Sequence, residues 1–353
     1  MRVLVTGGAG FIGSNFIRFL LERHPSYQVV NLDKLTYAGN LERLRDVASN
    51  PRYEFVQGDI CDSALVGHLM REVDAVAHFA AETHVDRALM DPGAFITTDV
   101  YGTYVLLRAA HEAGVKRFLH VSTDEVYGEV PPGRSSREDD PPAPRNPYSA
   151  SKAGAEMQVS AFHQTYGLPV VIARPANNVG PYQHPEKVVP LFVTNALQDL
   201  PLPVYGDGRQ VRDWLYVEDN CEALDLLLHQ GTTGQAYNIP AGNLRENVYM
   251  TRLLLKLLGK PESLLRFVED RPGHDRRYCM DGTKLRTLGW APRHSFEQAL
   301  EKTVAWYLDN RWWWERIIQT SQFQDYYRAQ YERRLRPGQA PPPSNSVHRA
   351  ERA

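Results

Sequence analysis

Short apolar runs alternate with longer helical patterns through the first half of this chain. The predicted strands cover residues 2–6, 28–32, 53–57, 74–79, 117–122 and 169–174, and the predicted helices include 11–24, 93–114 and 147–166. Strands that are separated by helices run parallel, because each helix carries the chain back across a face of the sheet. The pattern therefore predicts an α/β fold, a Rossmann-type doubly wound parallel sheet that binds ligands beyond the carboxyl ends of its strands.

The alternation stops near residue 175. Loops that contain Pro, Gly and Tyr then separate predicted helices, which cover 187–199, 218–230, 247–258 and 296–316. We expect a first domain over residues 1–175 and a smaller mixed α/β lobe over 176–317, with substrate contacts on its loops and some strands returning to the first domain. Residues 318–353 form a C-terminal extension, which we expect to be disordered from about residue 333 because it is rich in Pro, Arg, Gln and Ser.

Charge and cysteine content exclude several classes of protein. The formal net charge is −2, so there is no global basic field to attract nucleic acid or a membrane surface. No apolar run approaches the roughly 20 residues of a membrane helix, and no targeting segment precedes the first strand. Three separated cysteines, without metal-ligand spacing, indicate a reducing compartment and no metal site. We expect a soluble, cytoplasmic protein.

A glycine-rich turn joins the first strand to the first helix. Its sequence is Thr-Gly-Gly-Ala-Gly-Phe-Ile-Gly, residues 6–13. Glycines at Gly7, Gly10 and Gly13 allow backbone N–H groups at a helix N-terminus to approach a pyrophosphate. The second strand ends in Asp33, whose carboxylate would accept hydrogen bonds from ribose hydroxyls and repel a 2′-phosphate. The segment predicts a dinucleotide site that prefers NAD to NADP, with Asp59 on the adenine side.

A tyrosine and a lysine lie four residues apart at the start of the helix predicted over 147–166. Asn146 suits the N-cap, and the following proline suits the first helical position. Tyr148 and Lys152 then share one face of the helix. An ammonium about 4 Å from a phenol would lower its pKa by about three units, to about 7. We therefore expect Tyr148 to remove an alcohol proton while a hydride moves to the nicotinamide.

Three polar residues follow the strand predicted over 117–122. Thr123 can hydrogen-bond the reacting hydroxyl and Tyr148, which is sufficient for alcohol oxidation. Alcohol oxidation does not require the two carboxyl groups that follow, Asp124 and Glu125. Once C4 of a hexose is a ketone, one carboxylate can remove the C5 proton while one carboxylic acid protonates the departing C6 hydroxyl, provided that their pKa values differ. The hydride can then return to C6.

Together these motifs resemble the dTDP-glucose 4,6-dehydratase family of extended short-chain dehydrogenases. The resemblance covers about residues 1–317. It depends on the glycine-rich turn and on segments at 33–40 (DKLTYAGN), 80–87 (AAETHVDR), 122–128 (STDEVYG), 148–152 (YSASK), 177–183 (NNVGPYQ), 205–208 (YGDG), 212–214 (RDW) and 270–275 (DRPGHD). It implies Tyr148 as oxidation base with Lys152 as its partner, Asp124 as the acid towards C6 and Glu125 as the base at C5.

The same resemblance implies two sets of binding residues and a homodimer joined through helices of the first domain, here 93–114 and 147–166. The residues expected around NAD are Gly7, Gly10, Phe11, Ile12, Gly13, Asp33, Lys34, Leu35, Thr36, Asp59, Ile60, Ala80, Ala81, Thr98, Tyr148, Lys152 and Asn178. Those expected around the nucleotide sugar are His84, Thr123, Asn177, Lys187, Val188, Pro203, Tyr205, Arg212, Asn247, Arg271 and His274. Of the latter, the three cations are suited to clamp a diphosphate.

Four positions depart from the family's usual pattern. Asp99 stands for an asparagine, so an amide donor near the cofactor is lost, and Thr83 stands for a serine. Val179 and His184 replace aromatic residues in the loop after residue 176. These changes affect the expected shape of the sugar–diphosphate pocket and the choice of nucleotide, but they remove no catalytic group.

Other activities use the same fold. A UDP-sugar 4-epimerase or a UDP-glucuronate decarboxylase would need the Tyr148–Lys152 pair but not Asp124 and Glu125. A GDP-mannose 4,6-dehydratase would share the chemistry, but Asp33 disfavours the NADP that such enzymes tend to use. A non-catalytic dinucleotide sensor would need none of the acid–base residues.

Overall fold

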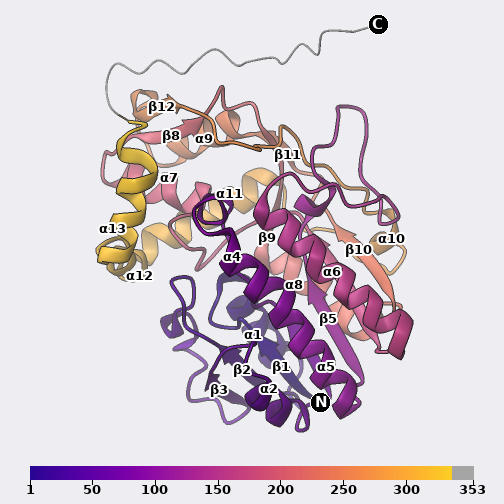
Figure 1. Cartoon of the computed structure of the whole chain (residues 1–353). Coiled ribbons are helices and arrows are strands. Elements are labelled where there is room, and N and C mark those ends of the chain that lie inside the picture. The colour runs from indigo at the N-terminus through magenta and orange to yellow at the C-terminus, as the bar shows by residue number, and fades with distance from the viewer. Residues whose placement is uncertain (336–353) are drawn as a thin grey trace, which may run out of the picture.

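The computed structural model describes residues 1–335, and the largest sheet in this part of the chain has seven parallel strands (Figure 1). Their order across the sheet is β10-β6-β5-β4-β1-β2-β3. The bounds are β1 (Arg2–Thr6), β2 (Gln28–Asp33), β3 (Tyr53–Gln57), β4 (Ala75–His78), β5 (Arg117–Val121), β6 (Val170–Pro175) and β10 (Gln235–Ile239). The order reverses between β1 and β4, which is where ligands bind in such sheets.

Helices cover both faces of this sheet, which confirms the doubly wound α/β fold. Helices α1 (Phe11–Arg23) and α8 (Val217–Gln230) pack together on one face, and α2 (Ser63–Met70), α5 (Thr103–Ala113) and α6 (Pro147–Tyr166) pack on the other. Alternate strand residues supply the two apolar cores, because successive side chains in a strand point to opposite faces. Val3 and Val5 of β1 enter the core under α1, whereas Leu4 enters the core under α5.

The second lobe lies above the carboxyl edge of the sheet in Figure 1 and has its own core. It contains a three-stranded sheet, β7 (Asn177–Val179), β9 (Val211–Tyr216) and β11 (Leu244–Glu246), and a parallel pair, β8 (Leu202–Tyr205) and β12 (Leu265–Val268). Its principal helices are α7 (Val188–Leu197), α9 (Asn247–Leu257), α11 (Phe296–Asp309) and α12 (Arg311–Ile318); α10 (Thr283–Arg286) packs against β10 of the main sheet. The chain returns from the lobe to the main sheet in α8 and β10, which pairs with β6, and again in α10.

The predicted strands of the first domain match the observed ones to within a residue, but two predicted helices are not uniform. The stretch 93–114 consists of α4 (Pro92–Phe95), a π-helical segment η2 (Ile96–Gly102) and α5. The prediction of one helix over 296–316 is wrong, since the chain turns at Asn310 between α11 and α12. Trp313 and Trp314 are buried in the core of the second lobe. No described helix is long and apolar enough to span a membrane.

The C-terminal extension is folded over much of its length. Helix α13 (Ser321–Tyr327) and the π-helical segment η5 (Arg328–Glu332) lie along the second lobe, in yellow at the end of the coloured chain in Figure 1. Tyr326 and Tyr331 are buried in the core of that lobe. The expected disorder falls mostly on residues 336–353, which lie outside the described residues.

Candidate active site

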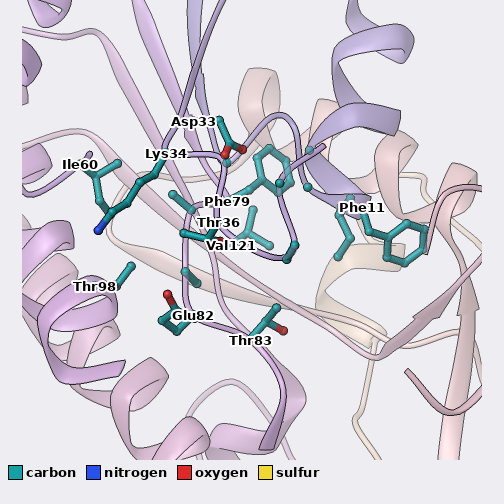
Figure 2. Close-up of a pocket in the computed structure, with 18 of the residues that line it drawn as sticks. Phe11, Asp33, Lys34, Thr36, Ile60, Phe79, Glu82, Thr83, Thr98 and Val121 are labelled. Atoms are coloured by element: carbon teal, nitrogen blue, oxygen red, sulfur yellow. The ribbon is translucent and has the colours of Figure 1, made fainter. Parts of the chain in front are cut away.

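Two adjoining pockets open at the carboxyl edge of the main sheet. The first runs along the glycine-rich turn and the ends of β1, β2 and β4, and Figure 2 shows its lining. The second lies between the loop after β4 and the second lobe. Lys187 lines both pockets. Two ligands, or two parts of one ligand, can therefore lie side by side, one in each pocket.

Most residues expected around NAD line the first pocket. They are Gly7, Gly10, Phe11, Ile12, Gly13, Asp33, Lys34, Thr36, Asp59, Ile60, Ala80, Ala81, Thr98, Tyr148 and Lys152. Leu35 and Asn178 are not part of this lining. Leu35 adopts a positive φ of 59° in the turn after β2, and the side-chain amide of Asn178 donates to the carbonyl of Ala176. Residues that were not predicted, among them Arg43, Phe79, Glu82 and Gln183, complete the wall.

Two glycines in the turn are required by close backbone approach. Gly7 has a φ of 71°, and a Cβ atom there would lie 2.6 Å from the backbone nitrogen of Ala80. A Cβ atom on Gly13 would lie 2.4 Å from the carbonyl oxygen of Gly7. Side chains at either position would therefore separate the turn from its neighbours. The turn exposes the first backbone N–H groups of α1 to the pocket, which is the arrangement that binds a pyrophosphate.

Asp33 and Asp59 are both held as hydrogen-bond acceptors at one end of the first pocket. The carboxylate of Asp33 accepts the backbone N–H groups of Ala9 at 2.9 Å and Leu35 at 2.8 Å, although burial raises its pKa. Asp59 forms a 2.7 Å ion pair with Lys34. Each carboxylate oxygen can accept more than one hydrogen bond, so Asp33 remains able to bind ribose hydroxyls. The residues fit the adenosine end of NAD.

Tyr148 and Lys152 lie in the first turns of α6, as expected. Asn146 and Ser149 form a capping box at the start of the helix. Lys152 reaches beneath the pocket and donates from Nζ to the carbonyl of Val121 at 2.8 Å. The predicted lowering of the Tyr148 pKa is wrong for the chain without ligands. Burial raises the pKa of Tyr148 well above its ordinary value, and the negative charges of Glu125 and Asp99 raise it further.

Asp124 and Glu125 begin a short 3₁₀ turn, η3 (Asp124–Tyr127), immediately after β5. Thr123 is its N-cap. The Thr123 hydroxyl accepts the backbone N–H of Glu125 at 3.3 Å and donates to Asp124 at 3.1 Å. Thr123 also lies near Tyr148, where it partly offsets the raised pKa of the phenol. Thr123 therefore contacts the Asp124 carboxyl group and the Glu125 backbone, but it does not line the second pocket.

The two carboxyl groups have different surroundings. Asp124 is buried, one of its oxygens has no hydrogen-bond partner within residues 1–335, and burial together with the charge of Glu125 raises its pKa to about 8. Glu125 lines the second pocket and accepts a hydrogen bond from the hydroxyl of Tyr278 at 3.3 Å. At neutral pH Asp124 is therefore protonated, and its neighbour Glu125 faces the second pocket.

The second pocket contains nearly all of the residues expected around a nucleotide sugar. They are His84, Asn177, Lys187, Val188, Pro203, Tyr205, Arg212, Asn247, Arg271 and His274. Thr123 is the exception. Sequence reasoning missed Asp86, Glu186 and Tyr331 in this lining. Asp86 lies inside the recognised segment 80–87, but Tyr331 comes from the C-terminal extension, which contains no recognised motif.

Three cations of this pocket are held by neutral or acidic partners. Arg271 donates to Asp86 at 3.2 Å, and Arg212 donates to the carbonyl of Asp275 at 2.9 Å. The ammonium of Lys187 donates to the Thr83 hydroxyl at 3.1 Å, and burial lowers its pKa to about 8. All three line the same pocket, which suits a diphosphate.

The two histidines of the pocket are neutral imidazoles. Burial lowers the pKa of His84 to about 3 and that of His274 to about 4. His274 lies 2.6 Å from the carboxylate of Asp270, but burial outweighs this attraction. His84 has a φ of 101°, a strained backbone geometry for a side chain with a Cβ atom. These residues can exchange hydrogen bonds with a ligand but add no positive charge.

The chain is similar to curated proteins over most of its length. The Agl12 low-salt glycan biosynthesis protein of Haloferax volcanii is 52% identical over 87% of this chain and 99% of its own length. A dTDP-glucose 4,6-dehydratase of an Actinoplanes species is 51% identical over 89% of this chain and 100% of its own length. At lower identity, the dTDP-glucose 4,6-dehydratase of Escherichia coli is 44% identical over 91% of this chain and 97% of its own length.

Solved structures agree with this grouping. DesIV of Streptomyces venezuelae, a dTDP-glucose 4,6-dehydratase crystallised with NAD, is 51% identical and superposes with a TM-score of 0.88 over 90% of this chain and all of its own. The UDP-glucose 4-epimerase of Thermus thermophilus, also with NAD, is 34% identical with a TM-score of 0.81, over 88% of this chain and all of its own. The sequence model of GDP-mannose 4,6 dehydratase matches residues 4–303. The chain is thus a member of the GDP-mannose 4,6 dehydratase family.

Proposed function

We propose that this chain is an NAD-dependent dTDP-glucose 4,6-dehydratase, which forms dTDP-4-keto-6-deoxyglucose by oxidation at C4, loss of water across C5–C6 and reduction at C6. The observation that carries the proposal is the carboxyl pair at the end of β5, where Asp124 has a pKa of about 8 and Glu125 faces the second pocket. Relatives with this activity are 44–51% identical over most of the chain.

The first domain, residues 1–175, would hold NAD in the first pocket, and the lobe over 176–317 would hold most of the nucleotide sugar. The glycine-rich turn would bind the pyrophosphate of NAD, and Asp33 would bind the ribose. Lys187, Arg212 and Arg271 would bind the diphosphate of the substrate. Bound NAD supplies a hydride acceptor for C4, a hydride donor for C6 and a positive charge on the oxidised nicotinamide.

Tyr148 would act as the base of the oxidation step. Its side chain lines the first pocket and lies near Thr123. Burial and the nearby carboxylates oppose its ionisation in the chain alone. The ammonium of Lys152 and the positive charge of oxidised nicotinamide both favour the phenolate, so the tyrosine would become a base only in the loaded enzyme.

Asp124 and Glu125 would carry out the elimination. Glu125 would remove the C5 proton, which the C4 ketone makes acidic, and Asp124 would give its proton to the departing C6 hydroxyl. The different surroundings of the two carboxyl groups support these roles, because elimination needs one base and one acid at the same pH. A 4-epimerase needs neither group, which favours the dehydratase over the epimerases that share the fold.

The substrate class is narrower than the family name suggests. The carboxylate of Asp33 disfavours the 2′-phosphate of NADP, and three of the similar proteins named above are dTDP-glucose 4,6-dehydratases. Uridine differs from thymidine by one methyl group, which is worth only about 1–3 kcal/mol in a pocket. The proposal therefore includes a preference for dTDP-glucose, with slower use of UDP-glucose.

The direct test is turnover of dTDP-glucose, UDP-glucose and GDP-mannose by the purified protein with catalytic amounts of NAD. We expect a 4-keto-6-deoxy product, which absorbs near-ultraviolet light in alkali, to form fastest from dTDP-glucose, with no net consumption of NAD. A galactose product, or stoichiometric reduction of NAD, would refute the proposal.

Replacing Glu125 by glutamine separates oxidation from elimination. We expect Glu125→Gln to reduce bound NAD when dTDP-glucose is added but to lose about a hundred- to ten-thousand-fold in product formation, because the C5 base is missing. Absorbance of the reduced nicotinamide reports the first step, and sugar analysis reports the second. The matched control is Asp139→Asn, a surface carboxylate with a side chain 84% exposed, which should keep both rates. Full turnover by Glu125→Gln would exclude it as the base.

The pKa of Asp124 predicts the alkaline limit of the elimination step. Its folded-state pKa is raised to about 8, so the acid form is present below that pH and is lost as the pH rises through it. Product formation should therefore decline above about pH 8. In Asp124→Asn, the rate should be low at every pH and this decline should disappear. Measuring kcat against pH for both proteins tests the role, and an unchanged decline in the variant would assign it to another group.

We also propose a homodimer. Apolar side chains are exposed on α3 (Val85–Met90), η2 and α6, which pack against one another on the face covered by α5; the exposed residues are Leu89, Met90, Ile96, Tyr101 and Met157. Such a contiguous apolar surface usually marks an interface. Of these elements, η2 and α6 belong to the helices that the family resemblance implies, whereas α3 precedes them. The three free cysteines and the proposed substrate are consistent with work in the cytoplasm.

Charged substitutions on this surface should dissociate the dimer. Ile96 is 62% exposed and Met157 is 49% exposed. The double change Ile96→Asp and Met157→Asp should therefore give a folded monomer with little loss of stability. Light scattering after size-exclusion chromatography measures the mass. Leu308→Asp, at an exposed apolar residue of α11, is the control and should remain dimeric. A wild-type monomer, or a dimeric double variant, would contradict the proposed interface.

A further inference from the structure

Asp99 is a buried carboxylate that the proposed chemistry does not use. It lies in the π-helical segment η2 and is 1% exposed. One carboxylate oxygen accepts the backbone N–H of Glu82 at 2.7 Å, and the other accepts the hydroxyl of Ser151 at 2.6 Å. Neither donor is a cation, so these contacts stabilise the negative charge without neutralising it.

The two hydrogen-bond partners of Asp99 belong to both functional segments of the first domain. Glu82 lies in the loop that lines the first pocket, as Figure 2 shows. Ser151 precedes Lys152 in α6. The carboxylate therefore lies between the expected cofactor site and the helix that carries the tyrosine and lysine.

The backbone of η2 is fixed from the opposite side by a buried chain of hydrogen bonds. The Thr103 hydroxyl donates to the carbonyl of Asp99 at 2.5 Å and lies 2.9 Å from Nε2 of His78. Nδ1 of the same imidazole lies 2.7 Å from the hydroxyl of Thr6, at the end of β1. Because π-helical turns are rare and occur mostly at functional sites, this support is consistent with a specific position for the carboxylate.

The charges around Lys152 leave Asp99 as its available counter-charge. Two carboxylates, Asp99 and Glu156, favour the charged form of the buried ammonium. Glu156 is already engaged by Arg174, with Nε–Oε1 at 3.0 Å and Nη2–Oε2 at 2.5 Å. The nearby imidazoles, His78 and His120, are neutral because burial lowers the pKa of each.

The other ionisable neighbours of Asp99 do not replace it. Glu82 is a second acid facing Asp99, and it is itself faced by the cations Arg87 and Lys34. Tyr148, from α6, also feels the negative charge of Asp99.

We infer that Asp99 is a positioning residue that supplies the counter-charge of Lys152, and that it thereby sets the pH range in which Tyr148 can remove the hydroxyl proton. The inference rests on the proposed roles of Tyr148 and Lys152. Asp99 acts on the lysine through space, since the ammonium donates its hydrogen bond to Val121. A negative charge near both groups raises the pKa of each, so its removal must lower both.

Asp99→Asn removes the charge and keeps the contacts. The amide oxygen can still accept the N–H of Glu82, and the amide nitrogen can donate to the hydroxyl of Ser151. That hydroxyl keeps its own acceptor, the carbonyl of Tyr148 at 2.8 Å. The variant therefore tests electrostatics separately from packing.

The measurement is the rate of NAD reduction after rapid mixing with dTDP-glucose, recorded against pH. We expect both limbs of the Asp99→Asn profile to move to lower pH, by about one to two units for a charge several ångströms away at an effective dielectric of about 20. Burial raises the pKa of Asp99 to about 6, so wild type loses the same charge below that pH. The two profiles should therefore differ above about pH 6 and converge below it.

Two further variants make the outcome specific. Ser151→Ala removes a donor that stabilises the Asp99 carboxylate, so Asp99 should stay protonated up to a higher pH. The Ser151→Ala profile should therefore coincide with the Asp99→Asn profile up to a higher pH than the wild-type profile does. Glu112→Gln changes the net charge equally at an exposed site of α5, where the side chain is 63% exposed, and should leave the profile in place.

An unchanged pH profile in an active Asp99→Asn enzyme would overturn the inference. An equal loss of rate at every pH, together with a lower Tm, would also overturn it, because it would indicate a packing role for Asp99. If Asp99→Asn does not fold, an unshifted Ser151→Ala profile would overturn it. Wild-type protein that never reduces NAD with dTDP-glucose would refute the proposed function as well, a result distinct from the other two.

Discussion

The site depends on the parallel pairing of β1 with β4 and of β4 with β5. Register fixes Thr6 beside His78 and His78 beside His120, so three loops leave the sheet at the same edge. These loops carry the glycine-rich turn, the segment from Ala80 to His84, and the residues Thr123 to Glu125. Because backbone hydrogen bonds set this register, groups more than a hundred residues apart in the chain meet within one pair of pockets.

Burial is the main electrostatic influence at this edge. It is the largest cause of the raised pKa of Asp124 and Tyr148 and of the lowered pKa of Lys152 and Lys187. A dry site destabilises each isolated charge but strengthens the attraction or repulsion between charges. The protonation states of the acid–base residues are therefore set jointly by their neighbours and by a bound ligand. Asp99 belongs to the same set, although it contacts neither pocket.

The second lobe completes the site through its loops and through the end of the described chain. Gln330 donates to the hydroxyl of Tyr205 at 2.6 Å, and Tyr326 lies 3.3 Å from Nδ1 of His84. These contacts join the C-terminal segment to residues of the second pocket. The binding surface is thus formed by segments from both lobes. The proposed domain boundary near residue 175 divides the sequence, but it does not divide the second pocket.

The sequence by itself determined the sheet, its helices and most of the pocket lining. Alternating apolar runs specify parallel strands, and a glycine at position 7 is required wherever the backbone approaches Ala80 so closely. The acid–base residues were predictable because they follow strands whose ends must meet. The helix break at Asn310 was not predicted, although asparagine is a common helix cap; in the structure the indole N–H of Trp314 donates to the carbonyl of Tyr307 across this turn.

Tertiary structure alone decided the protonation states and the role of remote segments. Spacing suggested that Lys152 lowers the pKa of Tyr148, but the folded chain buries the phenol among carboxylates and raises it instead. Likewise, Tyr331 enters the second pocket from the C-terminal extension, for which no role in the site was predicted. Both outcomes depend on which groups share a water-excluded volume, and local sequence periodicity carries no information about that volume.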